Sequence, residues 1–217
     1  MNKPGAEPAP EPIPEPIREP GDSRPRIGVL ALQGDFAAHA RALEEAGAVA
    51  LEVRKPAELA GLDGLILPGG ESTTFLKFLE RDGFLESLQR FVEQKPAFGT
   101  CAGCILLAKN VSHPAQESLA VMDISVERNA YGRQIDSAIQ TGETKLPGGP
   151  LEMVYIRAPR IISVGEGVEV MAERDGFPVL VRQGRLLAAT FHPELSSDGR
   201  VHRLFVDMVR ASRDHSA

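Results

Sequence analysis

The residue best suited to chemistry is Cys101, which lies in the pentapeptide Gly99-Thr100-Cys101-Ala102-Gly103 between a strand-like and a helix-like segment. Small residues around a nucleophile are typical of a strand–turn–helix elbow, in which the turn is strained and lifts the side chain above the sheet edge. The amino end of the following helix would favour the thiolate, and the N–H of Ala102 would be an oxyanion donor. The pentapeptide alone is equally compatible with a buried structural cysteine.

Cys104 provides another interpretation, because Cys101 and Cys104 form a C-x-x-C pair of the kind found in redox proteins. The glycine before Cys101 and the apolar run at 105–107 fit an elbow better, with Cys104 turned into the packing of the helix. Two cysteines three positions apart cannot join distant segments. They therefore argue against a disulfide framework and favour a reducing, cytoplasmic location.

A cysteine nucleophile needs a base, and the base needs a group that orients it. His192 stands out because the segment Phe191-His192-Pro193-Glu194 directly follows an apolar, strand-like run at 186–190. Ligands bind at the carboxyl ends of strands in open α/β sheets, and two-residue spacing can place His192 and Glu194 on one side of the chain. The segment alone could be a solvated loop. Joined to an elbow on the same sheet, it predicts a base and its orienting carboxylate.

The other four histidines lack such a context. His39 falls within an early helical pattern and is expected to be a surface or core residue, and His202 begins the last helix. His113 lies in a Ser-His-Pro loop, and His215 lies near the C-terminus. We assign none of them a chemical role.

The segment PGGEST at 68–73 is the third chemical element, and it ends an expected strand. Gly69 and Gly70 let backbone N–H groups approach a ligand closely, and Ser72 or Thr73 can cap the next helix. A phosphate cradle is disfavoured because the Walker lysine is missing and Glu71 would repel phosphate. A nest of N–H groups for an oxyanion fits better beside a thiolate.

A sheet with helices on both faces would bring these motifs together. Short apolar runs predict buried strands, which are expected at 27–32, 49–53, 65–67 and 97–99. Helical patterns occupy 36–46, 72–80, 84–94 and 102–109. The later chain is richer in strands, at 121–127, 153–156, 161–164, 168–173, 179–182 and 186–190, before a closing helix at 201–211. This alternation predicts a three-layer α/β fold with a mostly parallel central sheet and antiparallel additions.

The 217 residues suit one domain at 25–212, between a Pro/Glu-rich tail at 1–24 and a short C-terminal tail at 213–217. The first tail has too little apolar surface to offset ordering, so we expect it to be disordered and dispensable for activity. A proline-rich ligand for a partner domain is the alternative. The net charge of -6 argues against nucleic acid and acidic membranes as partners. No membrane span or signal-peptide pattern is evident, which again favours the cytoplasm.

The order of these motifs, beginning with LQGD at 32–35, resembles that of class I glutamine amidotransferases. More narrowly, three segments are similar to the glutaminase subunits of pyridoxal 5'-phosphate synthases: GVLALQGD at 28–35, ERNAYGRQ at 127–134 and IRAP at 156–159. The likeness covers 26–211, and the last two segments are far more specific than the elbow. Cys104 stands where the family usually has an aliphatic residue, Tyr131 is commonly Phe, and the Pro/Glu tail is extra. None of these departures removes a catalytic group, although Cys104 raises the question of oxidation sensitivity.

The resemblance implies a flavodoxin-like fold and hydrolysis of L-glutamine to glutamate and ammonia. Cys101 would attack the side-chain amide, His192 would transfer protons, and Glu194 would orient His192. The implied oxyanion donors are Gly70 and Ala102, with Gln33 close by. The implied glutamine contacts are Gly69, Gly70, Glu71, Arg128, Ile156 and Arg157. For Arg128 this agrees with chemistry, because a guanidinium can pair with the substrate α-carboxylate in a fork.

The resemblance also implies a partner, a (β/α)8-barrel synthase subunit that receives the ammonia within a large hetero-oligomer. Pyridoxal 5'-phosphate would then be the product of the complex, and this chain would need neither a cofactor nor a metal. Three alternatives remain at this point. They are an amidotransferase for another acceptor, such as that of an imidazole-glycerol or anthranilate pathway, a thiol redox protein, and a non-catalytic binding module.

Overall fold

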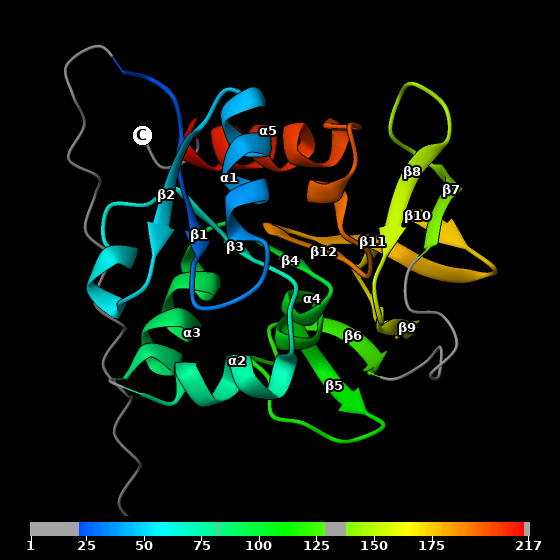
Figure 1. The fold of residues 1–217 in the computed structure, drawn as a ribbon, viewed down its shortest axis with the longest axis horizontal. Coiled ribbons are helices and arrows are strands. Elements are labelled where there is room, and N and C mark those ends of the chain that lie inside the picture. The colour runs from blue at the N-terminus through cyan, green and yellow to red at the C-terminus, as the bar shows by residue number, and fades with distance from the viewer. Residues whose placement is uncertain (1–21, 82, 129–137, 215–217) are drawn as a thin grey trace, which may run out of the picture.

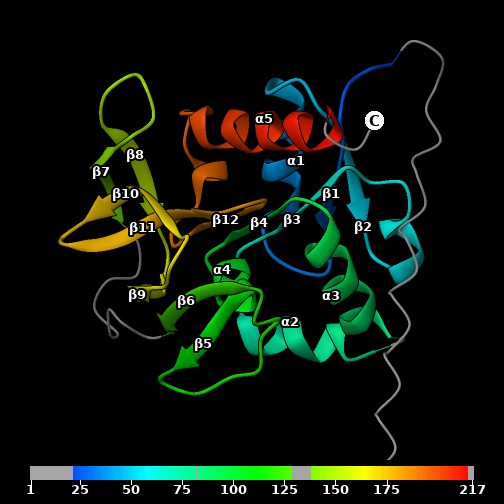
Figure 2. The ribbon, with the colours of Figure 1, turned by 180° about the vertical axis from the view of Figure 1, so that it is seen from behind.

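The computed structural model describes residues 22–81, 83–128 and 138–214. In it a nine-stranded sheet forms the middle layer, and helices cover both of its faces (Figures 1 and 2). Most of the Pro/Glu-rich tail and the end of the C-terminal tail lie outside the described residues. Within the described part of the chain, no helix is both long enough and apolar enough to cross a membrane.

One half of the large sheet is parallel, and its strands lie in the order β2 (Val49–Val53), β1 (Arg26–Leu30), β3 (Gly64–Leu67), β4 (Ala97–Thr100) and β12 (Leu186–Ala189). Every residue of β3, β4 and β12 is buried, which explains why Thr100, at the end of β4, is their one polar side chain. The first strand is shorter than its apolar run predicts, since it ends at Leu30 and the chain turns toward Gln33.

The other half of the sheet is antiparallel and consists of β11 (Phe177–Gln183), β10 (Glu169–Arg174), β7 (Ala138–Thr144) and β8 (Leu151–Tyr155). A separate three-stranded sheet contains β5 (Ala108–Ser112), β6 (Met122–Glu127) and β9 (Arg160–Val164). The predicted antiparallel additions are therefore present in the second half of the chain.

Two of these strands differ from the sequence-based prediction. The helix expected at 102–109 ends at Leu107, and the chain enters β5 directly. The apolar run that covers this boundary is compatible with a buried helix or a buried strand, so periodicity alone cannot locate the junction. Strand β7 was not predicted because it has few apolar residues and none of its residues is buried, and it is specified by pairing with β8 and β10.

The helices divide between the two faces of the sheet (Figures 1 and 2). On one face lie α1 (Phe36–Glu45) and α5 (Arg200–Asp214), and on the other lie α2 (Ser72–Leu79), α3 (Phe84–Gln94) and α4 (Ala102–Leu107). The described residues also form two short 3-10 helices, η1 (Pro56–Leu59) and η3 (Pro193–Leu195). Helix α5 is longer than predicted and includes residues 213 and 214 of the expected C-terminal tail.

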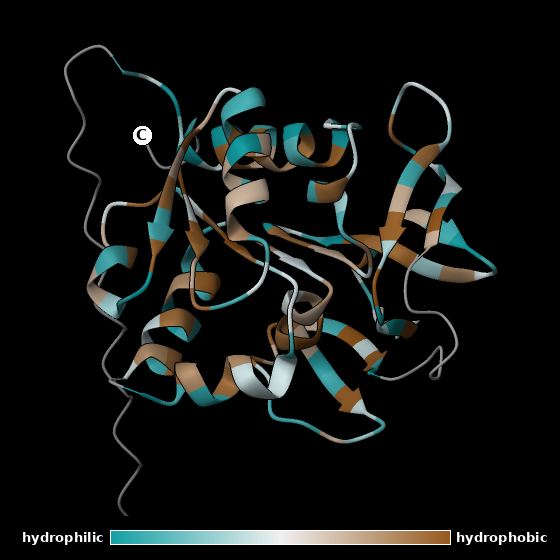
Figure 3. Cartoon of the chain, viewed as in Figure 1, coloured by the Kyte–Doolittle hydropathy of each residue, from teal (hydrophilic) through white to brown (hydrophobic). Residues whose placement is uncertain are grey.

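Each face of the sheet has its own apolar core. In Figure 3 the central strands are largely brown, whereas the helices mix brown and teal segments. Phe75 and Phe91 are fully buried in the core beneath α2 and α3. Phe98, Phe191 and Phe205 are fully buried in the core beneath α1 and α5. Burial of one such side chain stabilises the fold by roughly 1.5–3 kcal/mol, so the two cores hold the central sheet in place from both sides.

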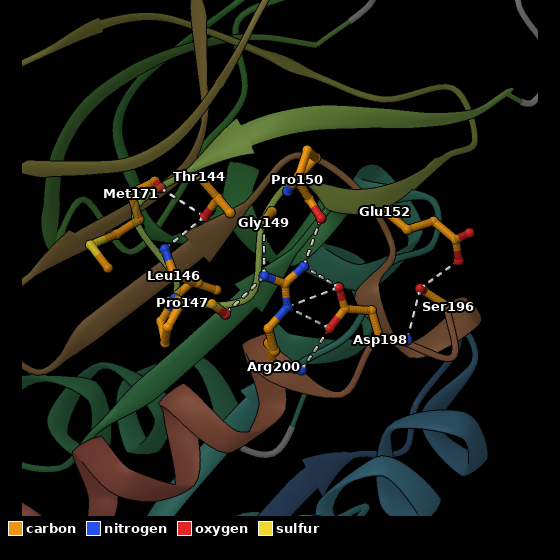
Figure 4. Close-up of polar contacts among 10 residues, drawn as sticks. All are labelled: Thr144, Leu146, Pro147, Gly149, Pro150, Glu152, Met171, Ser196, Asp198 and Arg200. Carbon is orange, nitrogen blue, oxygen red and sulfur yellow. Dashed lines mark hydrogen bonds and ion pairs between the residues drawn. The ribbon is translucent and has the colours of Figure 1, made fainter.

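Arg200, the first residue of α5, ties the end of the sheet to the segment that follows β12 (Figure 4). Its guanidinium donates to the carbonyl oxygens of Pro147, Gly149 and Pro150 at 3.0, 2.9 and 2.8 Å, and to the Asp198 carboxylate at 2.6 Å. The loop between β7 and β8 is thus fastened to the start of α5.

Candidate active site

The catalytic candidates meet because β1, β3, β4 and β12 are parallel neighbours, so their carboxyl ends lie at one edge of the sheet. Leu67 of β3 pairs with Gly99 of β4, and Ala189 of β12 pairs with Thr100. Cys101 follows Thr100 directly. The segments after Leu67 and Ala189 therefore flank it on its two sides, as the sequence predicts.

Cys101 has the strained backbone of a nucleophile elbow, with φ 48° and ψ −103°. A non-glycine residue in such a conformation costs on the order of 1–3 kcal/mol and is typical of active sites. Both glycines of the pentapeptide are required for close approach. A Cβ on Gly99 would lie 2.4 Å from the carbonyl oxygen of Gly103, and a Cβ on Gly103 would lie 1.9 Å from that of Leu67. The G-x-C-x-G pattern thus allows the turn from β4 into α4 to close and to pack against β3.

His192 and Glu194 form the expected pair. The Nδ1–H of His192 donates to Oε1 of Glu194 at 2.7 Å, and both residues are buried. The backbone N–H of His192 donates to the carbonyl of Val154 in β8, which fixes the segment after β12. The ring packs against Gly69, where an added Cβ would lie 2.4 Å from Cε1 of His192. A side chain at position 69 would overlap the His192 ring, so only glycine fits there.

The electrostatics of His192 suit acid–base catalysis beside a thiolate. Burial lowers the pKa of His192, but the interactions with nearby Cys101 and with Glu194, to which Nδ1 is hydrogen-bonded, outweigh burial and raise the pKa to about 10. Among the described residues, no group has good hydrogen-bonding geometry toward Nε2, the nitrogen that faces away from Glu194. The imidazolium form of His192 is thus stabilised at neutral pH.

Gln33 lies against the loop after β3, as expected of a residue near the oxyanion site. Its Nε2 donates to the carbonyl oxygen of Glu71 at 2.6 Å, and a Cβ on Gly70 would lie 3.2 Å from its amide. Gly70 has φ 144°, and a Cβ on Gly34 would lie 2.0 Å from the carbonyl oxygen of Gly69. The loops after β1 and β3 therefore pack closely against each other. Ala102, the other expected donor, is the buried first residue of α4.

Glu71 caps α2, whereas the sequence indicated Ser72 or Thr73 as the cap. Its carboxylate accepts hydrogen bonds from the N–H groups of Thr73 and Thr74 at 3.1 and 2.7 Å, and from both hydroxyls. The two threonine hydroxyls, followed by the two N–H groups, lower the pKa of Glu71 to about 2. A guanidinium nitrogen of Arg128 lies 3.8 Å away. Glu71 thus shapes the loop that presents Gly69 and Gly70 and lies next to the predicted carboxylate-binding arginine.

Ile156 lies beside Cys101. Its carbonyl oxygen is 3.8 Å from Sγ of Cys101, and its side chain is 39% exposed. Arg157 is exposed and has φ 45°, so the chain turns sharply after β8. Most of the ERNAYGRQ segment, residues 129–134, lies outside the described residues.

The sequence did not reveal that His39 contacts Glu194, nor that Thr100 and His202 hold the His39 ring. Nε2 of His39 lies 3.3 Å from Oε2 of Glu194 and 3.1 Å from Oγ1 of Thr100, while Nδ1 lies 3.0 Å from Nε2 of His202. All of these side chains are buried. Helical spacing was the available signal, since His39 and Leu43 share the buried face of α1. A histidine on an apolar face needs a buried polar partner.

Cys104 does not resemble the second half of a redox pair. Both cysteines are free, and Cys104 is fully buried in the core beneath α2 and α3. Burial, followed by the nearby Cys101, raises the pKa of the Cys104 thiol. The thiolate is therefore disfavoured, and the residue packs as an apolar group. No cluster of three or more His, Cys, Asp or Glu able to hold a metal was found in the part of the chain that the structure describes.

Comparison with known proteins places the chain among glutamine amidotransferases. A curated relative from Koribacter versatilis (strain Ellin345), the pyridoxal 5'-phosphate synthase subunit PdxT, is 65% identical over 185 residues, covering 85% of this chain and 96% of the relative. The PdxT subunit of Solibacter usitatus (strain Ellin6076) is 54% identical over 190 residues, covering 85% and 99%.

Solved structures support the same conclusion about the fold. A crystal structure of a glutamine amidotransferase superposes with a TM-score of 0.79 at 48% identity, covering 85% of this chain and 98% of the other. A GMP synthase component from Thermoplasma acidophilum shares the fold alone, with a TM-score of 0.67 at 19% identity and coverages of 90% and 98%. The predicted class I amidotransferase architecture is thereby confirmed. Because the model of the SNO glutamine amidotransferase family matches residues 29–211, the chain belongs to that family.

Proposed function

We propose that this chain hydrolyses L-glutamine through a Cys101–His192–Glu194 triad and supplies the ammonia for the synthesis of pyridoxal 5'-phosphate by a partner subunit. The observation that carries the proposal is the strained Cys101 beside a buried His192 whose pKa is raised to about 10. The chemical destination of the nitrogen rests on the relatives, which are named as subunits of pyridoxal 5'-phosphate synthase.

The first half of the proposed reaction forms a thioester. The Cys101 thiolate attacks the side-chain amide carbon of glutamine, and the negative charge moves to the amide oxygen. The N–H groups of Gly70 and Ala102 are the proposed donors to this oxyanion, with Gln33 holding the Gly70 loop. The His192 imidazolium then gives its proton to the departing nitrogen, so ammonia leaves and a glutamyl thioester remains.

The second half regenerates the enzyme. His192, now neutral, takes a proton from water as the water attacks the thioester carbon. Collapse of the intermediate expels the Cys101 thiolate and releases glutamate. Glu194 keeps Nδ1 of His192 protonated throughout, so that Nε2 is the nitrogen that exchanges the proton.

Residues around Cys101 are proposed to recognise the substrate. Arg128 would pair with the α-carboxylate of glutamine, and the ion pair with Glu71 at 3.8 Å would help hold the guanidinium in place. The carbonyl oxygen of Ile156 lies beside Cys101, where it would accept from the substrate. Gly69, Gly70, Glu71 and Arg157 complete the proposed contact set.

Ammonia must reach the partner without entering bulk water, where it would be protonated and lose its nucleophilicity. A receiving subunit docked over the sheet edge is therefore part of the proposal, and the family resemblance indicates a (β/α)8-barrel within a hetero-oligomer. Pyridoxal 5'-phosphate is then the product of the complex and not a cofactor of this chain. The free thiols of Cys101 and Cys104 are consistent with the proposed cytoplasmic location.

Glutamate release from L-glutamine, measured with and without the co-expressed synthase subunit, tests the proposal. We expect release in the presence of the partner, together with glutamine-dependent formation of pyridoxal 5'-phosphate. No glutamate release from the complete complex would refute the glutaminase. Glutamate release without product formation would refute the assigned acceptor.

A further inference from the structure

The proposed orienting carboxylate has a second partner that the triad does not include. The Glu194 side chain is fully excluded from solvent, and only Oε1 bonds to His192. No described group offers Oε2 a hydrogen bond of good geometry, but Nε2 of His39 lies 3.3 Å away. A buried carboxylate is costly unless both oxygens are compensated, so the contact with His39 is energetically important.

His39 is held in this place by two other elements. It projects from α1, whose amino end is fixed because Asp35 accepts the N–H of Ala38. Its Nε2 also lies 3.1 Å from the hydroxyl oxygen of Thr100, the residue before the nucleophile. One ring therefore contacts both the end of β4 and the segment that carries Glu194.

Burial and the neighbouring charges determine the protonation state of the His39 ring. Burial, followed by the charges of His202 and His192, lowers the pKa of His39 well below its usual value. Burial also lowers the pKa of His202 to about 4. Both rings are thus neutral near pH 7, and each carries a single N–H.

The neighbours of each nitrogen then select the tautomer. A hydrogen on Nδ1 of His39 would leave the Nε2 lone pair facing the Glu194 carboxylate, which is repulsive. A hydrogen on Nε2 points positive charge toward Glu194 and Thr100, and Nδ1 accepts from Nε2–H of His202 at 3.0 Å. Nδ1 of the neutral His202 ring then has a lone pair and no hydrogen. This agrees with the lack of any hydrogen-bond partner for that atom among the described residues.

We propose that His39 is a positioning residue of the reaction, whose Nε2–H bonds to Thr100 and places positive charge 3.3 Å from the second oxygen of Glu194, and that His202 sets the tautomer of His39. This inference rests on the proposed glutaminase function. The contact matters most once His192 has given its proton to ammonia. Glu194 is then a buried anion without a cationic partner, and the His39 N–H remains to stabilise it.

The test compares two substitutions of His39 in the complete complex. His39→Leu removes the donor at similar size, whereas the amide of His39→Gln restores an N–H near the position of Nε2. For His39→Leu we expect kcat to fall about 10- to 100-fold, with KM for glutamine within about threefold of wild type. His39→Gln should recover most of kcat.

Leu43→Ala is the matched control, because Leu43 is fully buried one turn further along α1 and belongs to the apolar core. It should lower Tm while leaving kcat of the folded complex unchanged. A His39→Leu complex that loses Tm but keeps wild-type kcat would overturn the inference. If wild type is inactive, or Cys101→Ala is fully active, the proposed function itself fails, and this result is distinct from the first.

A measurement on the unmodified protein covers the case in which His39→Leu does not fold. Nitrogen-15 NMR of the histidine rings distinguishes the two tautomers and the charged form. We expect His39 to be neutral at pH 7 with its hydrogen on Nε2. A hydrogen on Nδ1, or a charged ring, would overturn the inference.

Discussion

Replacing Gly103 with alanine sets two opposite effects against each other. In an exposed helix the change stabilises by about 0.5–1 kcal/mol, because alanine loses less backbone entropy than glycine. In this structure, however, a Cβ at position 103 would lie 1.9 Å from the carbonyl oxygen of Leu67 and 2.8 Å from its carbonyl carbon. Both are backbone atoms of β3, so no side-chain rotation can relieve the contact.

These distances determine the size of the expected effect. An ordinary Cβ contact begins at 3.4 Å, so α4 and β3 must separate by about 1.5 Å, the difference between 3.4 and 1.9 Å. Overpacking costs about 1–3 kcal/mol, and a contact with fixed backbone belongs at the upper end of that range. After the helix-propensity gain is subtracted, a loss of about 2 kcal/mol remains. For a domain of this size the loss lowers Tm by about 4–8 °C.

The same displacement should impair catalysis, because Cys101 directly precedes α4 and a misplacement of 1 Å can cost about 100-fold in rate. Thermal unfolding gives Tm, and glutamate release in the presence of the partner gives the rate. Gly199→Ala is the control, since its Cβ would meet only the rotatable guanidinium end of Arg203, at 2.9 Å. A Gly103→Ala protein with unchanged Tm and full rate would refute the elbow geometry.

The site and its supports lead to three further predictions. The pKa of His192 in the folded state is raised to about 10. The contribution of charged His192 to the stability of the folded state is therefore fully present below its usual pKa of 6.5 and is lost as pH rises through 10. The rate kcat/KM should therefore stay level from pH 7 to about 9 and fall above it, and a fall beginning near pH 6.5 would contradict this. Arg200→Met should lower Tm and increase proteolysis at 147–150, because three carbonyl contacts are lost; equal proteolysis in variant and wild type would be inconsistent with this anchor. Cys104→Ser should retain glutamine-dependent activity with a lowered Tm, since it buries a hydroxyl in an apolar core, and complete loss of activity in the folded variant would revive the redox interpretation.

The catalytic candidates could be predicted where adjacent residues determine the geometry. The two glycines around Cys101 are needed by the turn itself, and the spacing of His192 and Glu194 sets their relative placement. Both motifs follow apolar strands, so sequence order and the parallel sheet bring them to one edge.

Features of the site and fold that the sequence did not predict depend mainly on contacts between distant segments. His39 and Glu194 lie 155 positions apart, and no local pattern indicates that α1 packs against η3. The end of α4 could not be located either, because Ala108 continues an apolar run while its backbone has entered β5. Glu71 shows a different limit, since the sequence indicated Ser72 or Thr73 as the helix cap, whereas the packing of the loop gives that place to Glu71.

Formation of pyridoxal 5'-phosphate by the complex with Cys101→Ala tests the central claim most directly, with L-glutamine or ammonium chloride as the nitrogen source. The triad predicts that product formation from glutamine is abolished, because no thioester can form. It also predicts that formation from ammonium is retained, because the partner is intact. Glutamine-dependent product formation at the wild-type rate would contradict the assignment of Cys101 as the nucleophile.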